Sequence, residues 1–448
     1  MTDPVHPFDV RHRDIWAIAV PASVAFITEP IAGIVDTAVI GQLGDAGLLG
    51  GLSLGAVAFS VIFALAFFLR FGTAGLTAQA VGARDPLEGL LHMARAMIVA
   101  VGLGMVLVML AYPIALGFAF ALAPPPASRD AFSAYMLIRM VSVPFVLINF
   151  VLLGWFYGRA DARTGMWLQI LINVVNIVLS IVFVQGFGWG VPGAAWGTVI
   201  GQVVAAVLGL TIVVRHYHGV QAILVNTSAS ALLDLAPLLR MLAISRDLII
   251  RSAALMSAFA YFAAQGARVG DVALSANAIL MQLFSVAAFF LDGIATAAEQ
   301  LSGKAVGARW RPAFETSLKL SLGWGLIIAV GLCLVLYLGG SIAIDLMTTN
   351  PEVRAMARTY LIMAALTPLT GMPAFVYDGV MIGATLNATM RNGMIVSLLV
   401  YLVVASLLQP LLGLWGLWIA LHVLLLGRAA IYAVAIERRK PGLFPCPS

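Results

Sequence analysis

The chain has 448 residues, of which 62% are hydrophobic and 10% are charged, and its formal net charge is +5. Soluble domains carry about a quarter charged residues, so this composition excludes a water-soluble protein and indicates an integral membrane protein. The positive charge does not indicate nucleic-acid binding, because the basic residues are spread over short segments between apolar runs.

The N-terminal segment, MTDPVHPFDVRHRD, is polar. It lacks the short apolar core and small-residue cleavage site of a secretory leader, so we expect the first apolar run, from Ile15, to remain in the mature protein. The two cysteines, Cys333 in an apolar run and Cys446 in the tail, do not indicate a disulfide framework.

Twelve apolar stretches are long enough to cross a bilayer, which takes about 20 residues of helix. They predict transmembrane helices at roughly 15–39, 48–69, 94–122, 132–157, 166–185, 194–214, 247–267, 273–301, 318–344, 357–384, 393–412 and 414–436. Most Lys and Arg residues lie in alternate loops, which are on one side of the membrane. The loops on the other side contain only Arg129, Arg268, Arg354 and Arg358. Because cytoplasmic loops carry the excess of basic residues, we predict that both termini are cytoplasmic.

The sequence AVGAR occurs at 80–84 and again, 225 residues later, at 305–309. A second pair of similar segments begins with the same offset: GRADARTGM at 158–166 and GATLNATMRNGM at 383–394. The least hydrophobic interior segment, 215–240, separates two sets of six spans. We therefore predict parallel repeats related by an axis along the membrane normal: an N-lobe at 1–214, a cytoplasmic linker at 215–246 and a C-lobe at 247–448.

Four segments follow the order typical of multidrug and toxic compound extrusion (MATE) transporters: EPIAGIVDTAVIGQLGD (29–45), RFGTAGLTAQAVGA (70–83), LDGIATAAEQLSGKAVGAR (291–309) and YDGVMIGATLNATMRN (377–392). The chain resembles the DinF-type branch of this family over essentially its whole length. The resemblance implies an all-α integral membrane fold of twelve helices in two pseudo-symmetric six-helix bundles, arranged in a V. It also implies export of organic cations and other amphipathic compounds by alternating access, in exchange for H⁺ or Na⁺.

The first predicted span carries two acids, Glu29 and Asp36, and two prolines, Pro21 and Pro30. A spacing of seven residues places both carboxyl groups on one helix face, about 10 Å apart along the axis. Each proline removes a backbone donor and favours a bend, so we predict a hinge there. Because the bilayer disfavours a charged carboxylate, protonation of Asp36 is our predicted switch. The alternative is a carboxylate paired with a neighbouring donor that fixes the helix.

Three further residues complete the predicted ion-coupling site: Asn176 and Ser180 on the fifth span and Thr198 on the sixth. The resemblance implies that the first-span Asp meets a helix-5 Asn, a helix-5 Asp and a helix-6 Thr in one N-lobe pocket. Ser180 stands where the second acid is expected, so the site has one formal charge fewer. This loss weakens a cation site, so we predict coupling to H⁺; Na⁺ bound by Asp36, Asn176, Ser180 and Thr198 is the alternative.

The C-lobe has its own in-membrane polar residues: Asp292 and Glu299 on the eighth span, Asp378 on the tenth and Arg251 on the seventh. Such acids attract a cationic substrate, carry a second proton, or pair with a buried arginine, and the sequence leaves these roles open. Soft and aromatic side chains suit a promiscuous apolar cavity. Those on the seventh and eighth spans are the substrate candidates: Met256, Phe259, Met281 and Phe284.

These features predict a secondary active exporter of small organic compounds, acting as a monomer in the lipid bilayer of a bacterial inner membrane. The sequence contains no P-loop, nucleophile–base pair or metal-ligand spacing that stands out, so we expect neither an enzyme nor a bound cofactor. A lipid or lipid-linked precursor flippase is the nearest alternative. It would need a strongly basic cavity, whereas the in-membrane charges here are mixed. A passive channel would not need duplicated bundles with an asymmetric set of acids.

Overall fold

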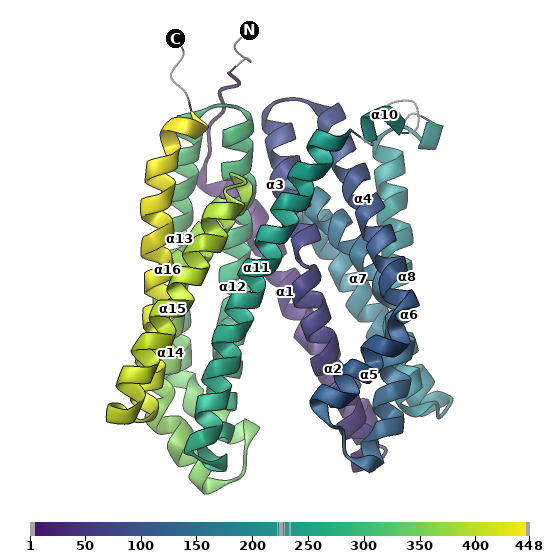
Figure 1. Ribbon diagram of the computed structural model, residues 1–448, viewed down its shortest axis with the longest axis vertical. Helices are drawn as coiled ribbons and strands as arrows, with labels where there is room; N and C mark the ends of the chain where they lie inside the picture. The colour runs from purple at the N-terminus through teal and green to yellow at the C-terminus, as the bar shows by residue number, and fades with distance from the viewer. Residues whose placement is uncertain (1–4, 222, 224–226, 228, 233, 445–448) are drawn as a thin grey trace. The chain divides into compact units, whose positions relative to one another are not determined.

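The computed structural model describes residues 5–221, 223, 227, 229–232 and 234–444, which form helices joined by short turns and contain no strand (Figure 1). Twelve helical stretches of this described part are long and apolar enough to span a membrane, which confirms the twelve predicted spans. In chain order the elements are α1 (His12–Gly41), α2 (Ala46–Ala66), α3 (Phe68–Gly82), α4 (Pro86–Met109), α5 (Ala111–Leu122), η1 (Pro126–Ser128), α6 (Arg129–Gly158), α7 (Ala162–Ile181), η2 (Val182–Gly186), α8 (Gly190–His216), α10 (Ala229–Leu232), α11 (Leu235–Val269), α12 (Asp271–Gly307), α13 (Arg311–Met347), α14 (Pro351–Gly383), α15 (Asn387–Leu412) and α16 (Leu414–Leu443).

Several helices differ from the predicted spans. The second span, expected at 48–69, is divided at Phe67 into α2 and α3, and α3 continues to Gly82. The third span, expected at 94–122, is divided at Leu110 into α4 and α5. Pro113 explains this break, because it has no N–H to bond the carbonyl four residues earlier and its ring clashes with that carbonyl. The seventh span begins at Leu235 rather than near 247, so α11 takes in the last part of the segment expected to be a linker.

Residue contacts divide the chain into two compact units. Unit 1 comprises Met1–Ser23, Ala78–Arg84 and Ala243–Ser448, and unit 2 comprises Val24–Thr77 and Asp85–Leu242. The division passes through α1, α3 and α11, so each of these helices belongs to both units. The lobes predicted at 1–214 and 247–448 follow the sequence repeat rather than compactness, and their boundaries stay a prediction.

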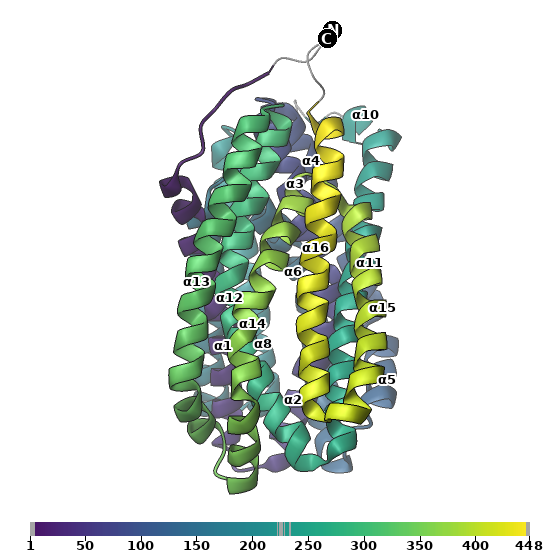
Figure 2. The ribbon, with the colours of Figure 1, turned by 90° about the vertical axis from the view of Figure 1, so that its left-hand side faces the viewer.

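One helix is central in each unit. In unit 1, α14 packs against α12, α13 and α16, and Figure 2 shows these four helices side by side. In unit 2, α6 packs against α2, α4 and α8. Helices α6 and α14 are the fourth and tenth spans, which are equivalent in the predicted duplication. Both halves are therefore organised around the same member of the repeat.

Backbone turns repeat with the offset found in the sequence. Arg84 and Arg309 end the two AVGAR segments with φ of 57° and 52°, and Ala160 and Thr385 have φ of 61° and 53°. Residue numbers in both pairs differ by 225. A left-handed residue just past a helix allows the following N–H groups to bond the last carbonyls of that helix. The two AVGAR segments thus form the same helix-ending turn, which supports the duplication.

Two glycines with the same offset allow neighbouring helices to approach closely. Gly154 of α6 lies against the backbone of Arg70 and the side chain of Thr73. Gly379 of α14 lies against α12, where an added Cβ would be 2.9 Å from the carbonyl carbon of Ala295. Apolar burial does not drive helices together within lipid, so close backbone packing at small residues takes its place.

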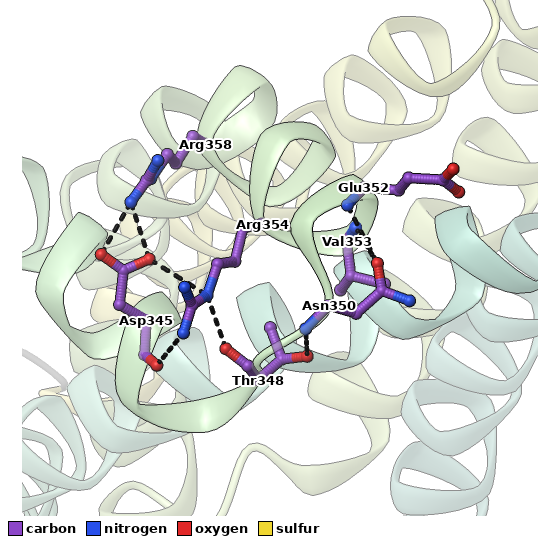
Figure 3. Close-up of polar contacts among 7 residues, drawn as sticks. All are labelled: Asp345, Thr348, Asn350, Glu352, Val353, Arg354 and Arg358. Carbon is purple, nitrogen blue, oxygen red and sulfur yellow. Dashed lines mark hydrogen bonds and ion pairs between the residues drawn. The ribbon is translucent and has the colours of Figure 1, made fainter.

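Polar contacts hold the turn between α13 and α14 (Figure 3). Arg358 Nη2 donates to both carboxylate oxygens of Asp345 at 2.7 Å, and Arg354 Nε donates to the Thr348 carbonyl at 2.7 Å. The side chain of Asn350 caps α14 by accepting two backbone hydrogen bonds. Exposed ion pairs and a helix cap thus add to the apolar packing of buried Ile344 and Val353 in holding this turn.

We expect Gly379→Ala to destabilise the protein by about 1–3 kcal/mol, because the new methyl group overpacks the contact between α14 and α12. The matched control is Gly339→Ala on α13, where nothing lies within 4 Å of an added Cβ. Thermal unfolding in detergent should show a lower midpoint for the first variant and an unchanged or higher midpoint for the second. Equal midpoints would contradict the packing role of Gly379.

Candidate functional site

Unit 2 contains a cavity of about 410 Å³ lined by α1, α2, α3, α6, α7 and α8. Its charged lining residues are two acids and two bases: Glu29, Asp36, Arg70 and Arg139. The uncharged polar lining includes Asn173, Asn176, Thr198 and three glutamine or asparagine side chains at 149, 169 and 202. Much of the remaining wall is aromatic: Phe26, Phe59, Phe63, Phe67, Tyr135, Phe150 and Tyr157. The cavity therefore combines an apolar, adaptable surface with a few fixed polar groups, as ligand sites do.

Asp36 is 9% exposed, and its Oδ1 has no hydrogen-bond partner among the described residues. Its polar neighbours are Asn176 and Ser180 of α7, which interact with its carboxyl group. Asn176 Oδ1 and Ser180 Oγ have no partner with full hydrogen-bond geometry among the described residues. Thr198 differs, because its Oγ1 accepts from Asn176 Nδ2 at 2.7 Å and donates to the Ala194 carbonyl at 3.2 Å. Buried polar atoms are rarely left unpaired. Three unpaired oxygens in one place fit a proton on the carboxyl group or a small cation.

Glycines of α8 bring this site together. A Cβ at Gly197 would lie 2.9 Å from both the backbone nitrogen and the Oγ of Ser180, and a Cβ at Gly201 would lie 2.8 Å from the Ile172 carbonyl. Because neither glycine has a side chain, α7 and α8 pack with their backbones close together, and the Asn176–Thr198 hydrogen bond bridges them. The i, i+4 spacing then places Ser180 on the same face of α7 as Asn176.

The second acid of α1, Glu29, lines the same cavity as Asp36. The structure therefore brings together the two carboxyl groups that the seven-residue spacing placed on one face. Next to Glu29, Thr28 Oγ1 accepts from Asn173 Nδ2 at 2.7 Å, which ties α1 to α7. Helix α1 runs without interruption through Pro21 and Pro30. The chain passes from unit 1 to unit 2 between these two prolines, after residue 23; their role as a hinge stays a prediction.

The acids of the second half have a different setting. Asp378 of α14 forms an ion pair and hydrogen bond with Arg251, and its Oδ2 lies 3.7 Å from Arg428 Nη2. Glu299 of α12 is 2% exposed, and Asp292 interacts electrostatically with Arg251. Of the roles that the sequence left open for Asp378, this geometry favours pairing with a buried arginine.

The predicted apolar substrate residues of α11 and α12 take part in packing within unit 1. Phe284 is 5% exposed, and its ring centroid lies 6.0 Å from that of Phe259. Phe259 and Met281 are partly buried against the hydrophobic core of this unit, and Met256 lies on the same helix as Phe259. A substrate role for these four residues stays a prediction.

The MatE family model matches the chain twice, over residues 21–182 and 248–411. This chain belongs to the MATE family. The two matches fall in the two halves of the repeat, as the duplication predicts. The E. coli (strain K12) protein named "DNA damage-inducible protein F" is 36% identical over 437 residues, which cover 95% of this chain and 92% of that protein. Membership makes the chain a transporter rather than an enzyme.

Two further relatives are informative for this MATE protein. A Staphylococcus saprophyticus protein named "Multidrug export protein MepA" is 25% identical over 194 residues, 43% of each chain. Among solved structures, a MOP superfamily transporter from Pyrococcus furiosus aligns with a TM-score of 0.85 at 19% identity, covering 96% of both chains. At that level of identity the structural match shows a shared fold.

Arg70 and Arg139 line the cavity, although the sequence analysis did not single them out. In the structure the guanidinium group of Arg139 lies over the rings of Phe59, Phe63 and Tyr135, and both arginines line the cavity. An arginine within an apolar run is itself a signal of function. The aromatic partners were not predictable, because Phe59 and Phe63 belong to a different helix from Arg139.

We expect Asp378→Asn to destabilise this MATE protein by about 3–5 kcal/mol, because it leaves buried Arg251 without its carboxylate partner. The control is Asp345→Asn, whose ion pair with Arg358 is exposed (Figure 3) and should contribute at most about 1 kcal/mol. Thermal unfolding in detergent compares the two. If Asp378→Asn unfolds at the same temperature as Asp345→Asn, the buried pair is not a structural element.

Proposed function

We propose that this chain exports amphipathic and cationic organic compounds in exchange for H⁺, by alternating access. The observation that supports this proposal best is the cavity of unit 2, where Asp36 is buried among unpaired oxygens beneath an aromatic wall. Aromatic faces attract organic cations, and a carboxylate supplies the charge that neutralises them. The name of the Staphylococcus relative, a multidrug export protein, points the same way.

Protonation of Asp36 is the proposed switch. An ionised Asp36 favours an organic cation in the cavity, and a proton entering from outside neutralises the carboxylate and removes that attraction. Proton and substrate therefore compete for one group, which is the condition for exchange. Asp36 lies on α1, which passes between the units with Pro21 and Pro30 on either side of the crossing. A change in charge at Asp36 thus acts on a helix shared by both units.

Na⁺ coupling is the second candidate, and one observation favours it. Among the described residues, Asp36 Oδ1, Asn176 Oδ1 and Ser180 Oγ have no hydrogen-bond partner, and oxygen ligands suit hard cations. Na⁺ would be held by these residues together with Thr198. Its binding would neutralise Asp36 as a proton does. The lipid flippase alternative receives no such support, because the cavity lining has equal numbers of acids and arginines.

We further propose that the protein is a monomer in the bacterial inner membrane with both termini in the cytoplasm. The orientation rests on the excess of Lys and Arg in alternate loops, and the location on the E. coli relative. In this orientation the two AVGAR turns face the cytoplasm.

Asp36→Asn should lower proton-driven uptake of a fluorescent organic cation by about tenfold or more, because an amide neither exchanges a proton nor neutralises a cation. The assay uses inside-out vesicles that contain the purified protein and have an acidic interior. The control is Asp130→Asn, an exposed acid at the start of α6, which should transport as the wild type does. Unchanged uptake by Asp36→Asn would refute the switch.

Ser180→Ala distinguishes the two coupling ions. With H⁺ coupling, uptake driven by the proton gradient should change by less than about threefold, since a proton on Asp36 does not need a fourth oxygen ligand. With Na⁺ coupling, uptake driven by an imposed Na⁺ gradient should fall by about tenfold, because one of few ligands is lost. Wild-type uptake driven only by Na⁺ would contradict the proposed H⁺ coupling.

A further inference from the structure

Unit 1 has an apolar groove of about 480 Å³ at the end where α13 begins and α16 ends. The chain meets itself there, since the ring centroids of Phe314 and Phe444 lie 5.3 Å apart. Helices α13 and α16 also pack against α14 (Figure 2). The groove is lined by side chains from all three helices: Leu318, Tyr377, Ala433, Val434, Ile436, Glu437 and Arg438. Ligand sites are roughly 300–1,000 Å³, so the groove is large enough to bind a ligand.

The groove is charged at one end and apolar along the rest. Arg438 follows Val434 by four residues, so both lie on one face of α16, with the charged group nearer the helix end. Val434 is 51% exposed, so the apolar part is open to the surroundings of the helices. Tyr377 interacts electrostatically with Glu437, and tyrosine is typical of the membrane–water interface. The groove thus leads from the interface toward the apolar part of the bilayer.

The acids at this end of unit 1 already have cationic partners. Glu315 accepts from Arg311 Nε at 2.8 Å, and Glu437 pairs with Lys440. The cations that remain are exposed and make no ion pair within 4.0 Å among the described residues: Lys319, Arg438 and Arg439. Lys319 belongs to the same cluster as Lys440, because both act electrostatically on Glu315. The charged end of the groove therefore has an excess of positive charge, which comes from both α13 and α16.

These cations and the groove beside them place two demands on a ligand. An exposed cation next to a membrane span is common and by itself identifies no ligand. A free anion would pair with the cations but would leave the aliphatic wall of the groove uncovered, and a neutral lipid would cover the wall but leave the cations unpaired. A molecule with an anionic group and a long apolar chain meets both demands. Basic clusters at the ends of membrane spans attract such anionic lipids.

We propose that this groove is a binding site for one anionic phospholipid, with the phosphate group at Lys319 and Arg438 and an acyl chain along the aliphatic wall. The lipid contacts α13, α14 and α16 together, so it holds the ends of three helices of unit 1. The groove shares no lining residue with the cavity of unit 2. The proposal therefore depends neither on the coupling ion nor on the exported compound.

The test measures lipid binding to the purified full chain in detergent by native mass spectrometry, with phosphatidylglycerol and phosphatidylcholine of identical acyl chains. The wild type should bind one phosphatidylglycerol about tenfold more tightly than phosphatidylcholine. The double variant Lys319→Gln, Arg438→Gln should weaken phosphatidylglycerol about tenfold, because each cation near a membrane surface contributes about fivefold, and should change phosphatidylcholine less than about twofold. The control, Arg84→Gln with Arg163→Gln, removes the same charge from exposed positions outside the groove and should bind both lipids as the wild type does.

A second variant tests the acyl chain. Ala433→Phe keeps every cation but fills part of the groove, and it should weaken both lipids about fivefold because fewer chain carbons are covered. Glycerol 3-phosphate, which has a phosphate group and no chain, should not displace phosphatidylglycerol.

Four results would overturn the proposal. Equal affinity for the two lipids, or an equal loss in the control variant, would show that the groove does not select an anionic headgroup. Displacement by glycerol 3-phosphate would identify a soluble anion as the occupant. A dimer in the mass spectrum that Ala433→Phe disrupts would identify a second copy of this chain as the occupant.

Discussion

Hydrocarbon offers no hydrogen bonds, and the polar groups of the membrane-spanning helices are placed under that constraint. The backbone meets it with helices, and Asp378 meets it by pairing with Arg251 and Arg428. In the cavity of unit 2, by contrast, Asp36 has no paired arginine, and among the described residues Asp36 Oδ1 and Arg139 Nε have no hydrogen-bond partner. Unpaired polar groups in such a medium favour binding of an ion or molecule that pairs with them. The proposed exchange of proton and substrate is therefore assigned to this cavity.

The number of spans could be predicted because the length of each apolar run can be read from the sequence. The duplication could be predicted because two motifs recur with one offset. The helix ends could not. Pro113 divides the third span, and a hydropathy average over 20 residues does not register one missing backbone donor. Leu235 begins α11 well before its apolar part, since a helix continues through polar residues such as Arg240 and Arg246 when its hydrogen bonds are satisfied.

Part of the candidate site was also predictable. The seven-residue spacing predicted that Glu29 and Asp36 lie on one helix face. The family resemblance added Asn176, Ser180 and Thr198. The structure places Asn176 and Ser180 beside Asp36. The aromatic environment of Arg139 was not predictable, because it depends on how α2 meets α6. Periodicity along one helix gives the face that a residue occupies. It does not give the neighbour across from that face, which depends on close-packed glycines such as Gly51 of α2 against α6.

Three of the four points at which the chain passes between the units lie inside helices. A loop is a flexible connection, whereas a hydrogen-bonded helix is stiff and resists bending. A change in the geometry of α1, α3 or α11 therefore reaches residues of both units along one continuous helix.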